Sequence, residues 1–227
     1  MIILKIIVFD LGGTLMQYVG MPLSWVDFYH KGFEAVNDKY NCKISSKLID
    51  EAVQILKEFN PRVNYREIEH SAEYIFSKAL EKWRMDIPIQ NCIETFWSGL
   101  KLSVEIYPDV IEVLKALKEK GFVIATLTDL PNAMPDEFFK RDIAELLIHI
   151  DYYVSSSVAG YRKPNCKGLQ LISDKYNVLI SDLIFVGDEE KDRNTANNAH
   201  CKFIKIDRTK RGDKSICNLY ELLNIID

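Results

Sequence analysis

Apolar and polar residues follow two different patterns along the chain. Residues 2–9 are apolar except Lys5 and rich in Ile and Val, as in a strand buried on both faces. In the C-terminal half, similar apolar runs alternate with segments of helical spacing. The runs lie at 122–128, 152–156, 183–187 and 202–206, and the helical segments near 110–120, 136–149, 165–177 and 190–199. Strands that alternate with helices of this size predict βαβ units, and therefore an α/β fold with a parallel sheet core.

Residues 17–101 break this alternation, because they contain only apolar stripes at helical spacing. The stripes run from Trp25 to Tyr40, from Leu48 to Phe59, from Ile68 to Trp83 and from Ile89 to Leu100. Roughly 85 residues are too many for a connecting loop, and four amphipathic helices are expected to pack as a bundle. We therefore predict an α/β core formed by residues 1–16 and 102–227, with an inserted four-helix-bundle domain at 17–101.

The composition narrows the class of partner. The chain has 29 basic and 33 acidic residues and no basic run, which argues against a nucleic-acid or membrane partner. Its five cysteines are scattered without a CxxC motif and indicate reduced thiols. The N-terminal apolar run is too short for a membrane span and lacks a signal-peptide cleavage pattern. We expect a cytoplasmic monomer or homodimer that acts on a small molecule.

Polar residues follow the predicted strands at their carboxyl ends, where ligands bind in parallel α/β sheets. Asp10 ends the first strand, Thr128 and Asp129 end the second, Lys163 follows the third, and Asp188 ends the fourth. Each has an ordinary explanation alone, since Asp is a common turn residue and a lysine before proline is usually exposed. The ordered set at successive strand ends instead predicts a site for a phosphoryl group.

The chemistry of these residue types fits that prediction. A carboxylate such as Asp10 can attack phosphorus and form an aspartyl-phosphate. Asp10 and Asp188, with Asp192 behind them, would form a hard oxygen site suited to Mg²⁺. Lys163 and Thr128, with backbone N–H groups of the Gly12-Gly13 turn, would hold the phosphate oxygens.

Four segments of the chain resemble the ordered motifs of the haloacid dehalogenase superfamily: FDLGGTL, ATLTDL, AGYRKPN and FVGDEEKD. The resemblance covers almost the whole chain and implies a Rossmann-like core, with residues 17–101 as a helical cap. It also implies that Asp10 is the nucleophile and that Lys163 and Thr128, with Asp129 and Gly13 beside them, bind phosphate. Asp10 and Asp188 would hold Mg²⁺ through their side chains and Gly12 through its backbone carbonyl.

Gly12 departs from the pattern of the phosphatases in this family, which usually carry a second Asp at that position as general acid. Such a group contributes on the order of 10²–10⁴ in rate. A phosphatase with Gly12 would therefore act on substrates with good leaving groups or take its acid from elsewhere, with Asp129, Glu189 and His30 as candidates.

Two other readings of Gly12 stay open beside a phosphatase. One is a hydrolase of another bond. A haloacid dehalogenase would not need the acidic pair after the fourth strand, and a phosphonoacetaldehyde-type hydrolase needs a cap amine. The candidate amines are Lys31, Lys39, Lys43, Lys47, Lys57, Lys78 and Lys82. The other reading is a catalytically silent protein that binds a phosphorylated metabolite.

Overall fold

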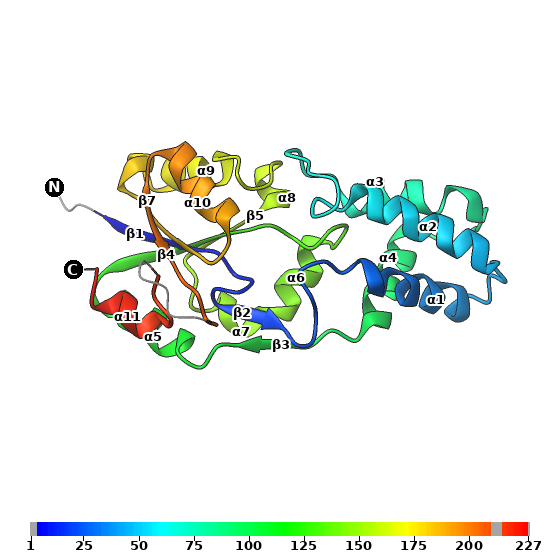
Figure 1. The fold of residues 1–227 in the computed structure, drawn as a ribbon, viewed down its shortest axis with the longest axis horizontal. Helices are drawn as coiled ribbons and strands as arrows, with labels where there is room; N and C mark the ends of the chain where they lie inside the picture. Colours follow the sequence, from blue (N-terminus) through cyan, green and yellow to red (C-terminus); the bar gives the residue numbers. More distant parts are fainter. Residues whose placement is uncertain (1–3, 210–214, 227) are drawn as a thin grey trace. The chain divides into compact units, whose positions relative to one another are not determined.

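The computed structural model describes residues 4–209 and 215–226, and the chain divides into two compact units. The first unit contains Gln17 and the residues before it, Val104–Asp129, and the residues from Lys140 onward. The second unit contains Tyr18–Ser103 and Leu130–Phe139. Figure 1 shows strands in the first unit and mainly helices in the second. No helix among the described residues is long and apolar enough to cross a membrane.

The first unit is built on a five-stranded sheet in the order β5-β4-β1-β6-β7. The strands are β1 (Lys5–Phe9), β4 (Phe122–Thr128), β5 (Tyr152–Ser155), β6 (Ile184–Gly187) and β7 (Lys202–Lys205), and all neighbouring pairs are parallel. The predicted parallel α/β core is therefore confirmed. Residues 2 and 3 of the predicted first strand lie outside the described residues. Because β1 is central, its carboxyl end lies between those of β4 and β6.

Helices cover both faces of this sheet (Figure 1). On one face α9 (Lys167–Tyr176) and α10 (Glu190–Ala199) pack on the strands, and on the other lie α5 (Val110–Glu119) and α11 (Leu219–Leu223). The helix expected near 136–149 is divided into α6 (Asp136–Asp142) and α7 (Ala144–Leu147). The short elements α8 (Ser156–Ala159), η3 (Ile180–Asp182) and α11 are among those that the sequence pattern did not predict.

The second unit contains the four expected helices. They are α1 (Tyr29–Lys39), α2 (Ser46–Phe59), α3 (Ala72–Ala79) and α4 (Ile89–Leu100), with the 3-10 turns η1 (Val26–Phe28) and η2 (Glu81–Trp83). α1 and α3 each pack against both α2 and α4, so the helices form a bundle. Phe33 in its core contacts the rings of Phe76 and Phe96. Short strands β2 (Met16–Tyr18) and β3 (Val104–Ile106) pair where the chain leaves and re-enters the first unit.

Residues 130–139 pack with the helical unit, whereas the sequence analysis assigned them to the core. The indole of Trp97 donates a hydrogen bond to the Ala133 carbonyl at 3.0 Å. The amide of Asn132 donates to the Leu56 carbonyl at 3.0 Å. The segment therefore begins directly after Asp129 of the first unit and belongs to the second by its contacts. Periodicity could not indicate this, because the hydrogen bonds join positions far apart in the chain.

Candidate active site

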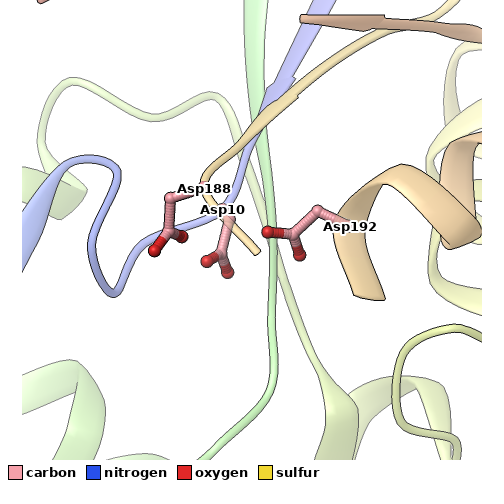
Figure 2. A group of neighbouring side chains, drawn as sticks. All are labelled: Asp10, Asp188 and Asp192. Carbon is pink, nitrogen blue, oxygen red and sulfur yellow. The ribbon is translucent and has the colours of Figure 1, made fainter. Parts of the chain in front are cut away.

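Three strand ends bring the predicted site residues together within the sheet unit. Asp10 directly follows β1, and its backbone N–H donates to the Val186 carbonyl of β6 at 2.9 Å. Asp188 directly follows β6, and Thr128 ends β4 on the other side of β1 with its side chain buried. Figure 2 shows the carboxylates of Asp10, Asp188 and Asp192 turned toward one another, the last from the first turn of α10.

Lys163 is not an exposed loop lysine but is 3% exposed. Its ammonium lies 2.7 Å from Asp10 Oδ1 and 2.5 Å from Asp192 Oδ1. Its backbone N–H donates to Asp129 Oδ1 at 3.0 Å. Burial alone would lower the pKa of this amine, but the charges of Asp10, Asp192 and Asp129 outweigh burial and raise its pKa above the usual value. Lys163 is therefore a fixed positive charge beside Asp10.

The three carboxylates offer ligand atoms that all lie within 4.8 Å of one another. Burial and the charges of Asp192 and Asp188 raise the pKa of Asp10 well above its usual value, although Lys163 opposes the shift. Burial and the charge of Asp192 raise the pKa of Asp188 to about 6. If all three carboxylates were ionised, they and the ammonium would carry a net charge of −2, and the raised pKa values reflect the cost of that excess without a cation. Hard oxygen donors with this excess fit a divalent cation such as Mg²⁺.

The two glycines of the turn after β1 differ in conformation. Gly13 has a φ of +78°, and a Cβ there would lie 2.2 Å from Asp188 Oδ2, so no side chain fits. Gly12 is exposed, is not among the residues with positive φ, and a Cβ there would meet nothing within 4 Å. Thr14, which follows Gly13, donates its hydroxyl to Asp188 Oδ1 at 3.3 Å. The turn therefore has room for the missing acid at position 12, and none at position 13.

Asp129 is held in its ionised form. Burial alone would raise its pKa, but Lys191, 3.3 Å from Oδ2, together with Arg162 and Lys163 lowers the pKa to about 2. A carboxyl group with that pKa is deprotonated at neutral pH and cannot donate a proton. The Asp129 carboxylate instead joins the backbone of Lys163 to two further cations, Arg162 and Lys191.

The other two candidate acids have partners of their own. Glu189 caps α10 and lies 3.5 Å from the Lys191 ammonium. His30 is in the helical unit, where its ring nitrogens lie 3.4 Å from Glu34 and 3.5 Å from Asp50. His30 is therefore not among the residues of the sheet unit that surround the carboxylate cluster.

Arg162, Lys191, Thr14 and Arg208 were not singled out in the sequence, although all lie in the network around the cluster. Arg162 and Lys191 are within the quoted motifs AGYRKPN and FVGDEEKD. Arg208 lies beyond the carboxyl end of β7 and donates to the Thr14 carbonyl. The strand-end rule that selected Asp10 and Asp188 would have selected Arg208 if it had been applied to this last strand.

Comparisons with known proteins identify the family of the chain. Residues 7–206 match the family model of the haloacid dehalogenase-like hydrolases. A phosphoglycolate phosphatase of Vibrio vulnificus (strain YJ016) is 27% identical over 205 residues, which are 87% of this chain and 81% of that protein. A crystal structure of a 2-haloacid dehalogenase from Pseudomonas syringae pv. Tomato DC3000 covers 98% of both chains at 21% identity, with a TM-score of 0.67.

A HAD phosphatase from Thermococcus onnurineus has a similar structure, with a TM-score of 0.62 at 20% identity over 98% of this chain and 97% of that one. These structural likenesses show the fold. The family match covers most of the chain and spans all four motifs, and the resemblance seen in the sequence is confirmed. The protein belongs to the haloacid dehalogenase-like hydrolases.

Proposed function

We propose that the protein is a Mg²⁺-dependent phosphatase that acts on a small phosphorylated metabolite through an aspartyl-phosphate on Asp10. The observation that carries the proposal is the contact of the buried Lys163 ammonium with Asp10, 2.7 Å away, within a cluster of three carboxylates that could hold a metal ion. The relatives named phosphoglycolate phosphatase support the same reaction class and make phosphoglycolate the first substrate to test.

The residues have distinct roles in this reaction. Asp10 attacks phosphorus and the ester oxygen leaves with the bonding electrons; water then hydrolyses the aspartyl-phosphate and restores the carboxylate. Lys163 orients Asp10 and attracts the phosphate, which also meets Thr128. The N–H of Gly13, expected from the sequence to bind phosphate, instead donates to the Met16 carbonyl at 2.8 Å. Asp10, Asp188 and the Gly12 carbonyl would hold Mg²⁺, which supplies positive charge against the phosphate oxygens when bound.

The two carboxylates behind these groups act indirectly. Asp192 contributes charge to the metal site and steadies Lys163, because one of its oxygens accepts from that ammonium and the other from the Glu189 N–H at 2.9 Å. Asp129 fixes the backbone of Lys163. Neither donates a proton to the leaving group, and Gly12 has no side chain to do so. The proposed substrates therefore have leaving groups that need little protonation.

Hydrolysis of other bonds is less well supported. Asp10, Asp188 and Asp192 together offer ligand atoms for a metal ion, for which a metal-free dehalogenase would have no use. A Schiff base needs a desolvated lysine of lowered pKa, yet none of the seven candidate cap lysines is buried. The buried Lys163–Asp10 pair argues against a silent binding protein, because burying an ion pair is unfavourable without a role for it.

The test is Asp10→Asn, compared with wild type on phosphoglycolate, an aryl phosphate and chloroacetate, each with Mg²⁺ and with excess chelator. We expect wild type to act only with Mg²⁺, and faster on the aryl phosphate than on phosphoglycolate, whose leaving group is a basic alkoxide. The variant should lose turnover, because an amide is a poor nucleophile. Borohydride reduction during turnover should convert Asp10 of the wild type to homoserine. Asp182→Asn, an exposed position in the same unit, is the matched control and should keep full activity.

Three results would contradict the proposal: phosphate hydrolysis by Asp10→Asn at a tenth of the wild-type rate, full activity in chelator, or chloride release from chloroacetate in place of phosphate release.

A further inference from the structure

We propose that Arg208 is a positioning residue that holds the Gly12–Thr14 turn, and through it the Mg²⁺ site, from behind. The inference rests on the proposed function for its catalytic consequence. The contacts of Arg208 on which it depends all lie within the sheet unit. Arg208 touches none of the atoms assigned to substrate, so its effect would pass through Thr14 and Asp188.

The fold brings Arg208 to this position by strand pairing. β7 pairs with β6 so that Lys205 is opposite Gly187, and the Ile206 N–H donates to the Gly187 carbonyl at 3.0 Å. Arg208 therefore leaves the sheet at the same edge as Asp188. The Asp207 N–H, which donates to the Ile216 carbonyl at 2.8 Å, fixes the direction of the chain there.

The guanidinium of Arg208 divides its donors between two partners. Nε and Nη2 both donate to the Thr14 carbonyl, at 3.0 and 2.6 Å. Nη1 lies 3.0 and 3.1 Å from the two carboxylate oxygens of Asp109. The guanidinium also stacks 4.0 Å above the centre of the Tyr107 ring. A lysine cannot replace these four contacts, because its three protons lie on one nitrogen and lack the planar fork that spans both partners.

Asp109 anchors this arrangement to the rest of the unit. It is 5% exposed, precedes α5, and accepts from the Leu219 N–H of α11 at 2.6 Å. Because the Asp109 carboxylate is buried and accepts from Leu219 and Arg208, its position is fixed. Arg208 connects it to the Gly12–Thr14 turn. The Tyr107 N–H holds the same turn by donating to the Leu15 carbonyl at 3.1 Å.

The turn needs such support because it contains two adjacent glycines. Glycine loses more backbone entropy on ordering than any other residue, so a Gly-Gly turn costs more free energy to hold in one conformation. The hydroxyl of Thr14, whose carbonyl Arg208 holds, donates to Asp188 Oδ1 at 3.3 Å. Holding Thr14 therefore orients two proposed metal ligands together, the Asp188 carboxylate and the Gly12 carbonyl. Outer-shell partners of this kind contribute about 10–100-fold to metal affinity or activity.

The experiment compares wild type with Arg208→Ala and Arg208→Lys in the full chain. Mg²⁺ binding is measured by calorimetry without substrate, and hydrogen exchange is followed at Thr14, Leu15 and Met16, whose N–H groups all donate to the Leu11 carbonyl. We expect Mg²⁺ affinity to fall about 10–100-fold in Arg208→Ala, with faster exchange at these amides. Low concentrations of guanidinium chloride should restore part of the affinity in Arg208→Ala, and the same concentration of urea should not.

Arg193→Ala is the matched control. Arg193 is also an arginine of the sheet unit that pairs with an acid, Glu190 at 3.4 Å, and stacks on a ring, that of Phe203 at 5.0 Å. Its side chain is partly exposed on α10. Its loss should leave Mg²⁺ affinity and hydrogen exchange in the Gly12–Thr14 turn unchanged. An equal loss in both variants would overturn the proposal, since any lost arginine would then have the same effect.

A folded Arg208→Ala with wild-type Mg²⁺ affinity and unchanged exchange would also overturn it. If Arg208→Ala does not fold, Arg208→Lys is the deciding variant, because it keeps a positive charge beside Asp109. Wild-type Mg²⁺ affinity and exchange in Arg208→Lys would refute the positioning role of Arg208. Weakened Mg²⁺ binding with faster exchange would support it. If wild type hydrolyses no phosphate, the proposed function is wrong, whereas the exchange of the turn still tests Arg208.

Discussion

Gly12→Asp tests the missing general acid directly, because position 12 has room for the side chain. Gly12 is exposed, lacks positive φ, and its Cβ would meet nothing within 4 Å. The new carboxyl would lie in the turn beside Asp10 and Asp188, whose pKa values are both raised. Their charges would raise the pKa of the new group as well, so that more of it is protonated near neutral pH.

The expected gain depends on the leaving group. A positioned general acid contributes about 10²–10⁴ in rate. The side chain at position 12 would have open space around it and no packing to fix its rotamer, so we expect the lower end, about 10²-fold on alkyl phosphates, or roughly 3 kcal/mol of barrier. Aryl and acyl phosphates expel weakly basic groups and should gain little.

The assay is kcat/KM with saturating Mg²⁺ for phosphate monoesters graded by leaving-group pKa. Wild type should show a steep decline with rising pKa, and Gly12→Asp a flatter one. Gly12→Asn has nearly the same shape without the acid and should keep the wild-type slope. Gly13→Asp is the positional control and should disrupt the site, because φ is +78° and the Cβ would lie 2.2 Å from Asp188 Oδ2.

Two results would refute the reasoning. Equal slopes for wild type and a folded Gly12→Asp would mean that another group already supplies the proton. A slope flattened equally by Gly12→Asn would mean that the shape of the residue, and not its acidity, changes the reaction.

Further predictions concern stability and the two units separately. Because the pKa of Asp188 is about 6 in the folded protein and about 4 unfolded, its ionisation destabilises the metal-free fold as pH rises from about 4 to 6. Asp188→Asn should therefore raise the free energy of unfolding of the metal-free protein at pH 7 by about 1–3 kcal/mol, and should have no such effect below pH 4. Urea titrations at several pH values measure this. Mg²⁺ should stabilise wild type and not the variant. A variant less stable than wild type at pH 7 would contradict this. In the helical unit, Trp97→Phe keeps an aromatic ring but leaves the Ala133 carbonyl without its indole donor. It should lower the free energy of unfolding by about 1–3 kcal/mol, and an unchanged urea midpoint would show that the bond to residues 130–139 is not stabilising.

The sequence by itself determined the parallel α/β core, the helical bundle and most residues of the candidate active site. Apolar periodicity is a local property, so it predicted the parallel sheet and the four-helix bundle without knowledge of packing. Parallel strands share one edge for their carboxyl ends, so the order of motifs was enough to expect Asp10, Lys163 and Asp188 together. The absence of the usual acid at Gly12 was also visible in the sequence alone.

The tertiary structure decided what each of these groups can do. Only φ and neighbouring atoms distinguish Gly12, which has room for a side chain, from Gly13, which has none. Only the nearby cations show that Asp129 is held ionised.

Arg208 and Thr14 illustrate the reason, since 194 positions of chain separate them and they still share two hydrogen bonds. The same holds for residues 130–139, which continue the chain beyond β4 and pack with the helical unit. A hydrophobic period depends on neighbours along the chain, whereas charge, burial and hydrogen bonding at a site depend on neighbours in space. The second set exists only after the chain has folded.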